Sequence, residues 1–146
     1  MYELMKAAVV LVALLGVLGC SGPSRSGVPV RRYEKILGTT LPADLALDVR
    51  EEQAGLDYAC FLRLRGNGQQ VQQFVSRLVF TDPVEHTNAW SKVRWRSLHR
   101  ATSAKWTPER VSDGQFGIHC EARSTFWVLW GTEDGEGVAY VMAFTQ

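Results

Sequence analysis

Alternating apolar and polar residues predict a β-hairpin in the first half of the chain. Leu45, Leu47 and Val49 alternate with small or polar neighbours, and residues 58–65 repeat this pattern. A period of two residues is typical of a strand with one buried face. The polar segment 51–55 between the two runs is expected to be their turn.

A helical period appears in two other stretches. Residues 31–38 place apolar side chains on one side and end at Gly38, which predicts a short helix. Residues 68–80 carry an apolar stripe at positions i, i+3, i+4 and i+7, and Asn67 and Gln70 have the spacing of a capping box. The stripe of this longer helix consists of Val71, Phe74, Val75 and Leu78.

Three more strands are predicted in the C-terminal third. In residues 116–122, Phe116, Ile118, Cys120 and Ala122 alternate with polar neighbours and are expected to form the apolar face of a strand. The apolar runs 125–130 and 138–144 flank Asp134-Gly135. Asp-Gly between two such runs is a strong hairpin signal. A two-residue turn there would pair Trp130 with Ala139, Val128 with Val141 and Phe126 with Ala143.

Both faces of this C-terminal hairpin are apolar, so we expect it at the centre of a sheet that is covered on both sides. The 68–80 helix is the expected cover on one face, and the Trp-rich segment 83–114 is a candidate for the other. The predicted fold is therefore α+β: an antiparallel sheet of about five strands in a single globular domain, residues 31–146.

The N-terminal segment has a different pattern. Residues 7–18 form an unbroken apolar run, which is shorter than the roughly 20 residues that a membrane-spanning helix needs and has the length of a signal-peptide core. Val17-Leu18-Gly19-Cys20, at the end of this run, resembles the lipobox of bacterial lipoproteins: an aliphatic residue, a variable one, a small one and the cysteine that is lipidated.

This resemblance implies that residues 1–19 are a signal peptide and that Cys20 carries acyl chains such as palmitate. Two or three chains anchor a protein stably in a membrane, whereas one does not. Ser21 after the lipidated cysteine is similar to an outer-membrane-directed signal of the enterobacterial type. Residues 20–30, rich in Gly, Ser and Pro, would then tether the domain on the periplasmic side.

Charge and cysteine content fit an exported domain. The formal net charge is +1, which gives no support to binding nucleic acid in bulk. Cys60 and Cys120 remain once Cys20 is assigned to lipid, and an even pair in an exported protein suggests a disulfide. The alternative is two unpaired thiols in the core.

The basic, Trp-bearing stretch from residue 90 to residue 110 is the candidate partner surface. Arg and Trp are enriched at interaction hot spots, and such a face would suit an envelope protein or an anionic envelope component. The alternative is that the indoles are buried against the sheet while the charges stay in water. The residues concerned are Trp90, Arg94, Trp95, Arg96 and Trp106.

No familiar catalytic or metal motif occurs in the sequence. Strand alternation points His119 and Cys120 to opposite faces, and His86 and His99 are isolated. No HExxH, CxxC, EF-hand or GxSxG pattern is present, so no metal, cofactor or catalytic residue is expected. The carboxylates of the C-terminal turn, Glu133, Asp134 and Glu136, are expected to be solvated.

These observations predict a non-enzymatic, lipid-anchored envelope protein that binds or holds another component. The alternative function is a periplasmic inhibitor or immunity-type lipoprotein that neutralises a toxin or hydrolase, because small size and a lipid anchor are typical of that class too.

Overall fold

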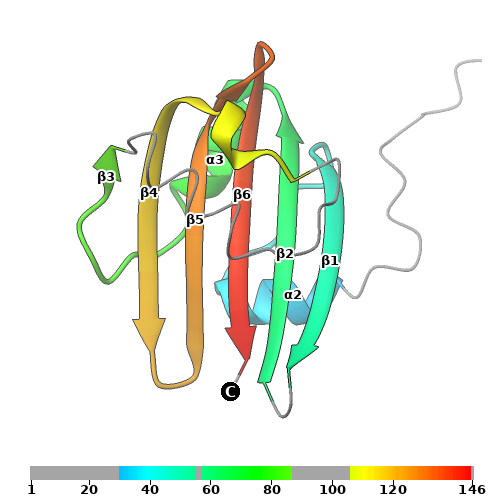
Figure 1. Cartoon of the computed structure of the whole chain (residues 1–146), viewed down its shortest axis with the longest axis vertical. Coiled ribbons are helices and arrows are strands. Elements are labelled where there is room, and N and C mark those ends of the chain that lie inside the picture. The colour runs from blue at the N-terminus through cyan, green and yellow to red at the C-terminus, as the bar shows by residue number, and fades with distance from the viewer. Residues whose placement is uncertain (1–29, 55–56, 87–105, 146) are drawn as a thin grey trace, which may run out of the picture.

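The computed structural model describes residues 30–54, 57–86 and 106–145, and they form one antiparallel sheet with helices on one face (Figure 1). The sheet has six strands in the order β1-β2-β6-β5-β4-β3. The strand bounds are β1 Ala46–Ala54, β2 Asp57–Gly66, β3 Glu85–His86, β4 Ser112–Glu121, β5 Ser124–Glu133 and β6 Glu136–Thr145. The predicted α+β class is confirmed, with one more strand than expected because the two-residue β3 pairs with the edge of β4.

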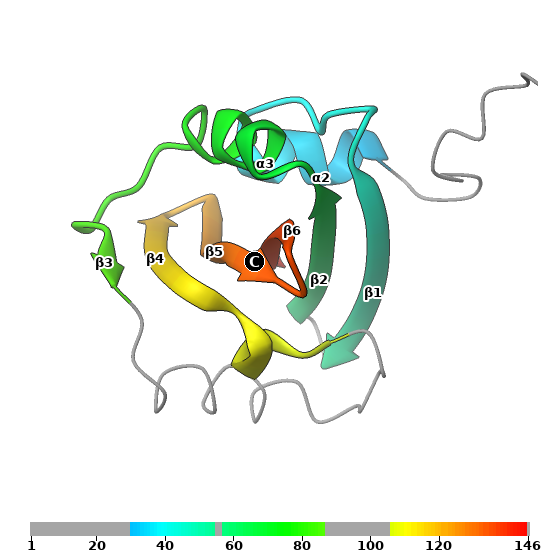
Figure 2. The same ribbon diagram turned by 90° about the horizontal axis from the view of Figure 1, so that it is seen from above.

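Two helices, α2 (Val30–Leu37) and α3 (Gly68–Val75), cover the same face of the sheet. Seen from above, they lie together on one side, while the short 3-10 helix η1 (Pro108–Arg110) crosses the opposite side (Figure 2). Each face therefore has its own apolar cluster. The cluster under the helices includes Tyr33, Leu62, Phe74, Phe126 and Val141. The cluster on the η1 face includes Phe61, Trp106, Val111, Leu129, Tyr140 and Met142.

The C-terminal hairpin has the predicted register. Strand β6 lies between β2 and β5 at the centre of the sheet, and the turn residues Asp134 and Gly135 have φ angles of 53° and 82°. Two successive positive φ values are characteristic of a type I′ turn, whose twist matches that of the strands. All three predicted pairs are present: Trp130 with Ala139, Val128 with Val141 and Phe126 with Ala143.

Both predicted helices exist, but the second is shorter than expected. Helix α2 ends before Gly38, whose φ is +67°, as the sequence indicates. Asn67 and Gln70 form the complete capping box at the start of α3. The helix stops at Val75, not at residue 80, although Leu78 is still buried in the cluster under the helices. The apolar stripe therefore extends about one turn beyond the last helical residue.

Two expectations about the strands are wrong. The segment expected as a turn, 51–55, contributes the last residues of β1, because Glu51 to Ala54 continue the ladder with β2. Strand β4 has the opposite face buried: His119 is buried and Cys120 is exposed. The helix-side face of β4 carries Gly117 and His119, which do not form an apolar pattern in the sequence.

Glycines allow the layers to approach. A Cβ at Gly137 of β6 would lie 2.6 Å from the Gly68 Cα, so the start of α3 rests directly on the backbone of the central strand. A Cβ at Gly117 would lie 2.6 Å from the Phe80 ring, which stacks on Trp130 with 5.6 Å between centroids.

None of the helices in the described ranges has the length and apolar character needed to cross a bilayer.

Candidate functional site

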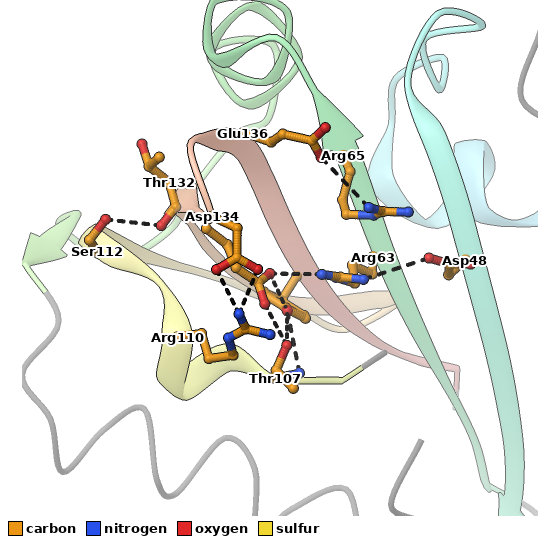
Figure 3. A network of polar contacts seen from close by, with 11 residues as sticks. Asp48, Arg63, Arg65, Thr107, Arg110, Ser112, Thr132, Asp134 and Glu136 are labelled. Carbon is orange, nitrogen blue, oxygen red and sulfur yellow. Dashed lines mark hydrogen bonds and ion pairs between the residues drawn. The ribbon is translucent and has the colours of Figure 1, made fainter. Parts of the chain in front are cut away.

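A polar network with a buried ion pair interrupts the apolar cluster on the η1 face (Figure 3). Glu133 ends β5, Arg63 lies on β2 and Tyr140 on β6, and Thr107 comes from the chain just before η1. Strand alternation directs the three strand residues to the same face. The central hairpin and the strand beside it therefore supply the network, and the crossing segment closes it.

The Glu133 carboxylate is the centre of this network. Its Oε1 accepts a hydrogen bond from Thr107 Oγ1 at 2.5 Å. Its Oε2 accepts from Tyr140 Oη at 2.7 Å and from Arg63 Nη2 at 2.9 Å. The side chains of Glu133 and Arg63 are only 2% and 12% exposed. Arg63 also approaches Asp48, with 3.9 Å between Nη1 and Oδ2.

Hydrogen bonding controls the ionisation of the buried carboxyl. Burial by itself would raise the pKa of Glu133, but the hydrogen bonds from Thr107, Arg63 and Tyr140 outweigh burial and hold the pKa below 4.5. Burial raises the pKa of Tyr140 to about 12. At neutral pH the network is therefore a carboxylate, a guanidinium and a neutral phenol.

Two exposed ion pairs surround the network. Arg110 of η1 binds Asp134 in the hairpin turn, with 2.6 Å from Nη2 to either carboxylate oxygen. Arg65 lies 3.6 Å from Glu136. Exposed pairs of this kind contribute about 0–1 kcal/mol each. The main effect of the Arg110–Asp134 pair is to orient η1 on the hairpin turn.

The network is suited to holding the crossing segment in place. All the Glu133 oxygens are engaged by donors of the protein itself. A carboxyl with a lowered pKa is also poorly matched to general acid–base work near pH 7, which requires a pKa close to the operating pH. Trp106 adds an apolar contact beside it, with edge-to-face packing on Phe61 and Tyr140 at 5.4 and 4.9 Å.

The expectation that Glu133 is a solvated turn residue is wrong, because it is buried. Asp134 and Glu136, by contrast, are exposed as expected. The sequence contains a signal that Glu133 is buried. Side chains of a strand alternate between its faces, so Glu133 shares a face with Gly131 and Leu129. A two-residue turn at Asp134-Gly135 makes Glu133 the last residue of the strand, so its side chain has to point to the apolar side.

The predicted partner surface lies mostly outside the described residues. Trp90, Arg94, Trp95 and Arg96 belong to segment 87–105, and Cys20 and the lipobox precede residue 30, so none of these can be placed. Trp106 is described, and it is 7% exposed in the core cluster. Its position agrees with the alternative in which the indole is buried against the sheet.

The predicted disulfide is not formed. Cys60 and Cys120 are both free, one buried and one exposed. Strands β6 and β5 lie between β2 and β4, and three strand spacings amount to about 14 Å, whereas a disulfide needs Cα atoms within about 7 Å. The two thiols also face opposite sides, because Cys60 is in the cluster under the helices while Cys120 alternates with the helix-facing His119.

The described residues line two cavities on the helix side of the sheet. The larger, about 490 Å³, is lined entirely by residues in contact with water, including Asp44, Gln73 and Arg77. The smaller, about 230 Å³, lies between the end of α2 and the β4–β5 hairpin and has a buried inner wall and an exposed rim. In the described part of the chain, no group of three or more His, Cys, Asp or Glu residues is arranged to hold a metal ion.

Comparison with protein-family models, with curated proteins and with solved structures gives no significant match for this chain. The function is therefore argued from the residues and the geometry alone.

Proposed function

We propose that this chain is a lipid-anchored protein of the bacterial cell envelope that acts as a non-enzymatic binding or structural module. The observation that carries the proposal is Val17-Leu18-Gly19-Cys20 at the end of a short apolar run. Acylated Cys20 supplies the membrane attachment, and residues 20–30 supply the tether. Ser21 favours the outer membrane, with the domain facing the periplasm.

The described domain supports a binding or structural role in one respect. Its buried ion pair, Glu133 with Arg63, is engaged in holding the segment before η1 on the sheet. The protein thus uses these charges for its own architecture. The envelope protein or anionic envelope component that it contacts would meet other surfaces, for which the segment with Trp95 and Arg96 stays the candidate.

Lipidation is tested with Cys20→Ala in the full chain expressed in a bacterial host. We expect unprocessed precursor and no incorporation of labelled palmitate, with the same block after globomycin treatment of the unmodified chain. Cys120→Ala is the matched control, because Cys120 is exposed and outside the lipobox. Normal processing and labelling of the Cys20 variant would refute the anchor.

The partner class is tested by pull-down from solubilised envelopes with the lipidated full chain. Recovery of structural or assembly components supports the proposal, whereas one stoichiometric toxin or hydrolase would replace it with the inhibitor or immunity function. Arg94→Gln/Arg96→Gln should weaken the recovered complex, and Arg31→Gln, an exposed arginine on α2, serves as the control.

A further inference from the structure

The smaller cavity is an open pocket lined by three separate parts of the fold. The end of α2 contributes Lys35, Ile36 and Leu37, and the chain after α3 contributes Arg77 and Val79. Strands β4 and β5 complete the cavity with residues His119, Glu121, Ser124 and Phe126. Its volume, about 230 Å³, is below the roughly 300–1,000 Å³ of pockets for drug-sized ligands. A small ligand is therefore the appropriate occupant.

The inner wall of this cavity is apolar. Leu37 and Phe126 are 4% and 2% exposed, so their side chains belong to the core under the helices. Val79, at the outer side, is 67% exposed, which makes it one of the large apolar side chains that the described surface leaves in water. An apolar body that entered the cavity would cover Val79 and contact Phe126, and each buried methylene group would gain about fourfold in affinity.

His119 forms part of the cavity wall. Its imidazole lines the cavity, is only 7% exposed and stacks on Phe126, with 4.6 Å between centroids. Nε2 is 3.0 Å from Ser124 Oγ and 3.9 Å from Glu121. Nδ1 is buried and has no hydrogen-bond partner among the described residues. The ring is held by Phe126 and Ser124, and its face adds to the apolar wall of the cavity.

The charged groups at the rim determine the head group. Lys35 and Arg77 are exposed cations on two different segments, and Glu121 is the single exposed carboxylate that lines the cavity. The rim therefore carries one net positive charge when the imidazole is neutral. A head group with one negative charge would neutralise this rim, whereas a cation would be repelled by the two basic side chains.

From these features we propose that the cavity between α2 and the β4–β5 hairpin binds a small amphipathic monocarboxylate. The apolar body would lie against Leu37 and Phe126, beside the His119 ring, and the carboxylate would lie at the rim near Lys35 and Arg77. The site does not depend on lipidation at Cys20, so it can hold or fail independently of the proposed anchor.

The test is an NMR titration of the full chain in phospholipid nanodiscs with octanoate as the probe. Histidine is isotopically labelled, and His119→Gln assigns the imidazole signals. We expect saturable shifts of the His119 signals with octanoate. Butyrate, four methylenes shorter, should bind about two orders of magnitude more weakly. Octylammonium, with the opposite charge, should give no saturable shift.

Two rim variants test the role of charge. Lys35→Gln and Arg77→Gln should each weaken octanoate binding by about two- to fivefold, the range for exposed charge pairs, while Arg31→Gln on the same helix layer leaves it unchanged. Both substituted side chains are exposed, so folding is not at risk. The proposal is overturned if octanoate gives no saturable shift, if octylammonium binds as tightly, or if the rim variants match Arg31→Gln.

Discussion

Replacing Glu133 with Gln would remove the charge at the centre of the buried network and keep the size of the side chain. The amide oxygen can still accept hydrogen bonds from Tyr140 and Arg63, and the amide nitrogen can donate to Thr107 Oγ1. The substitution therefore removes mainly the negative charge opposite Arg63. The Arg63 side chain is 12% exposed, and its next carboxylate, Asp48, is 3.9 Å away.

Breaking a buried ion pair by neutralising one partner costs about 3–5 kcal/mol when no other charge compensates. Because Asp48 and some water access reduce this value, we expect Glu133→Gln to lower the free energy of unfolding by about 2–3 kcal/mol. Urea unfolding of the full chain at pH 7, followed by tryptophan fluorescence, measures the change. Glu136→Gln is the matched control: its carboxylate is 60% exposed, so the loss should be below about 1 kcal/mol.

The same substitution predicts a pH dependence. The pKa of Glu133 is lowered from 4.5 in the folded protein, so its ionised form contributes stability that is complete above that value. As the pH falls below 4.5, the unfolded chain takes up the proton first and this contribution is lost. The difference in stability between wild type and Glu133→Gln should therefore be largest at pH 7 and shrink progressively below pH 4.5.

A double-mutant cycle with Arg63→Met isolates the pair. If the charge argument is right, Glu133→Gln costs about 1–3 kcal/mol less in the Arg63→Met background than in the wild type. The reasoning is refuted if Glu133→Gln costs no more than Glu136→Gln, or if the two changes in the cycle are additive.

Three further predictions concern packing, capping and thiols. Gly137→Ala should lower stability in urea by about 1–3 kcal/mol because its Cβ would meet the backbone of Gly68 at 2.6 Å, whereas Gly68→Ala, with open space around it, should not. Asn67→Ala removes the capping hydrogen bond from the Gln69 amide and should lower stability by about 1 kcal/mol in thermal unfolding. Gln72 is exposed in the middle of the helix, and an equal loss of stability in Gln72→Ala would contradict this prediction. Iodoacetamide should label exposed Cys120 in the native chain and Cys60 only after unfolding, because burial raises the pKa of the Cys60 thiol to about 11. Peptide mass spectrometry that finds the two cysteines linked by a disulfide would contradict this prediction.

The elements that could be predicted are those encoded by local pattern. The turn at Asp134-Gly135 admits one hairpin register, so the pairing of Trp130 with Ala139 follows directly. Asn67 and Gln70 are close in sequence, and their capping box forms within a single helical turn. In both cases the information lies within a few residues, and no distant part of the chain has to be known.

The candidate site was not predictable in the same way. Glu133 and Arg63 are 70 residues apart, and they meet only because β6 enters the sheet between β2 and β5. The disulfide expectation failed for the same reason, since sequence pattern gives no order of strands. The prediction of the buried face of β4 was wrong for a related reason. Gly117 and His119, which face the helix layer, are not apolar side chains, whereas exposed Cys120 is a residue type that is usually buried.

By itself, the sequence determined the fold class, most of the strands and both helix starts, whereas the lipid anchor at Cys20 stays a prediction. Hydrophobic period, turn chemistry and capping act over short distances, so they can be read along the chain. The tertiary structure decided the strand order, the burial of Glu133 and the cavity around His119. These features depend on which distant segments share a face, because a buried charge or a pocket exists only once several strands and helices have packed together.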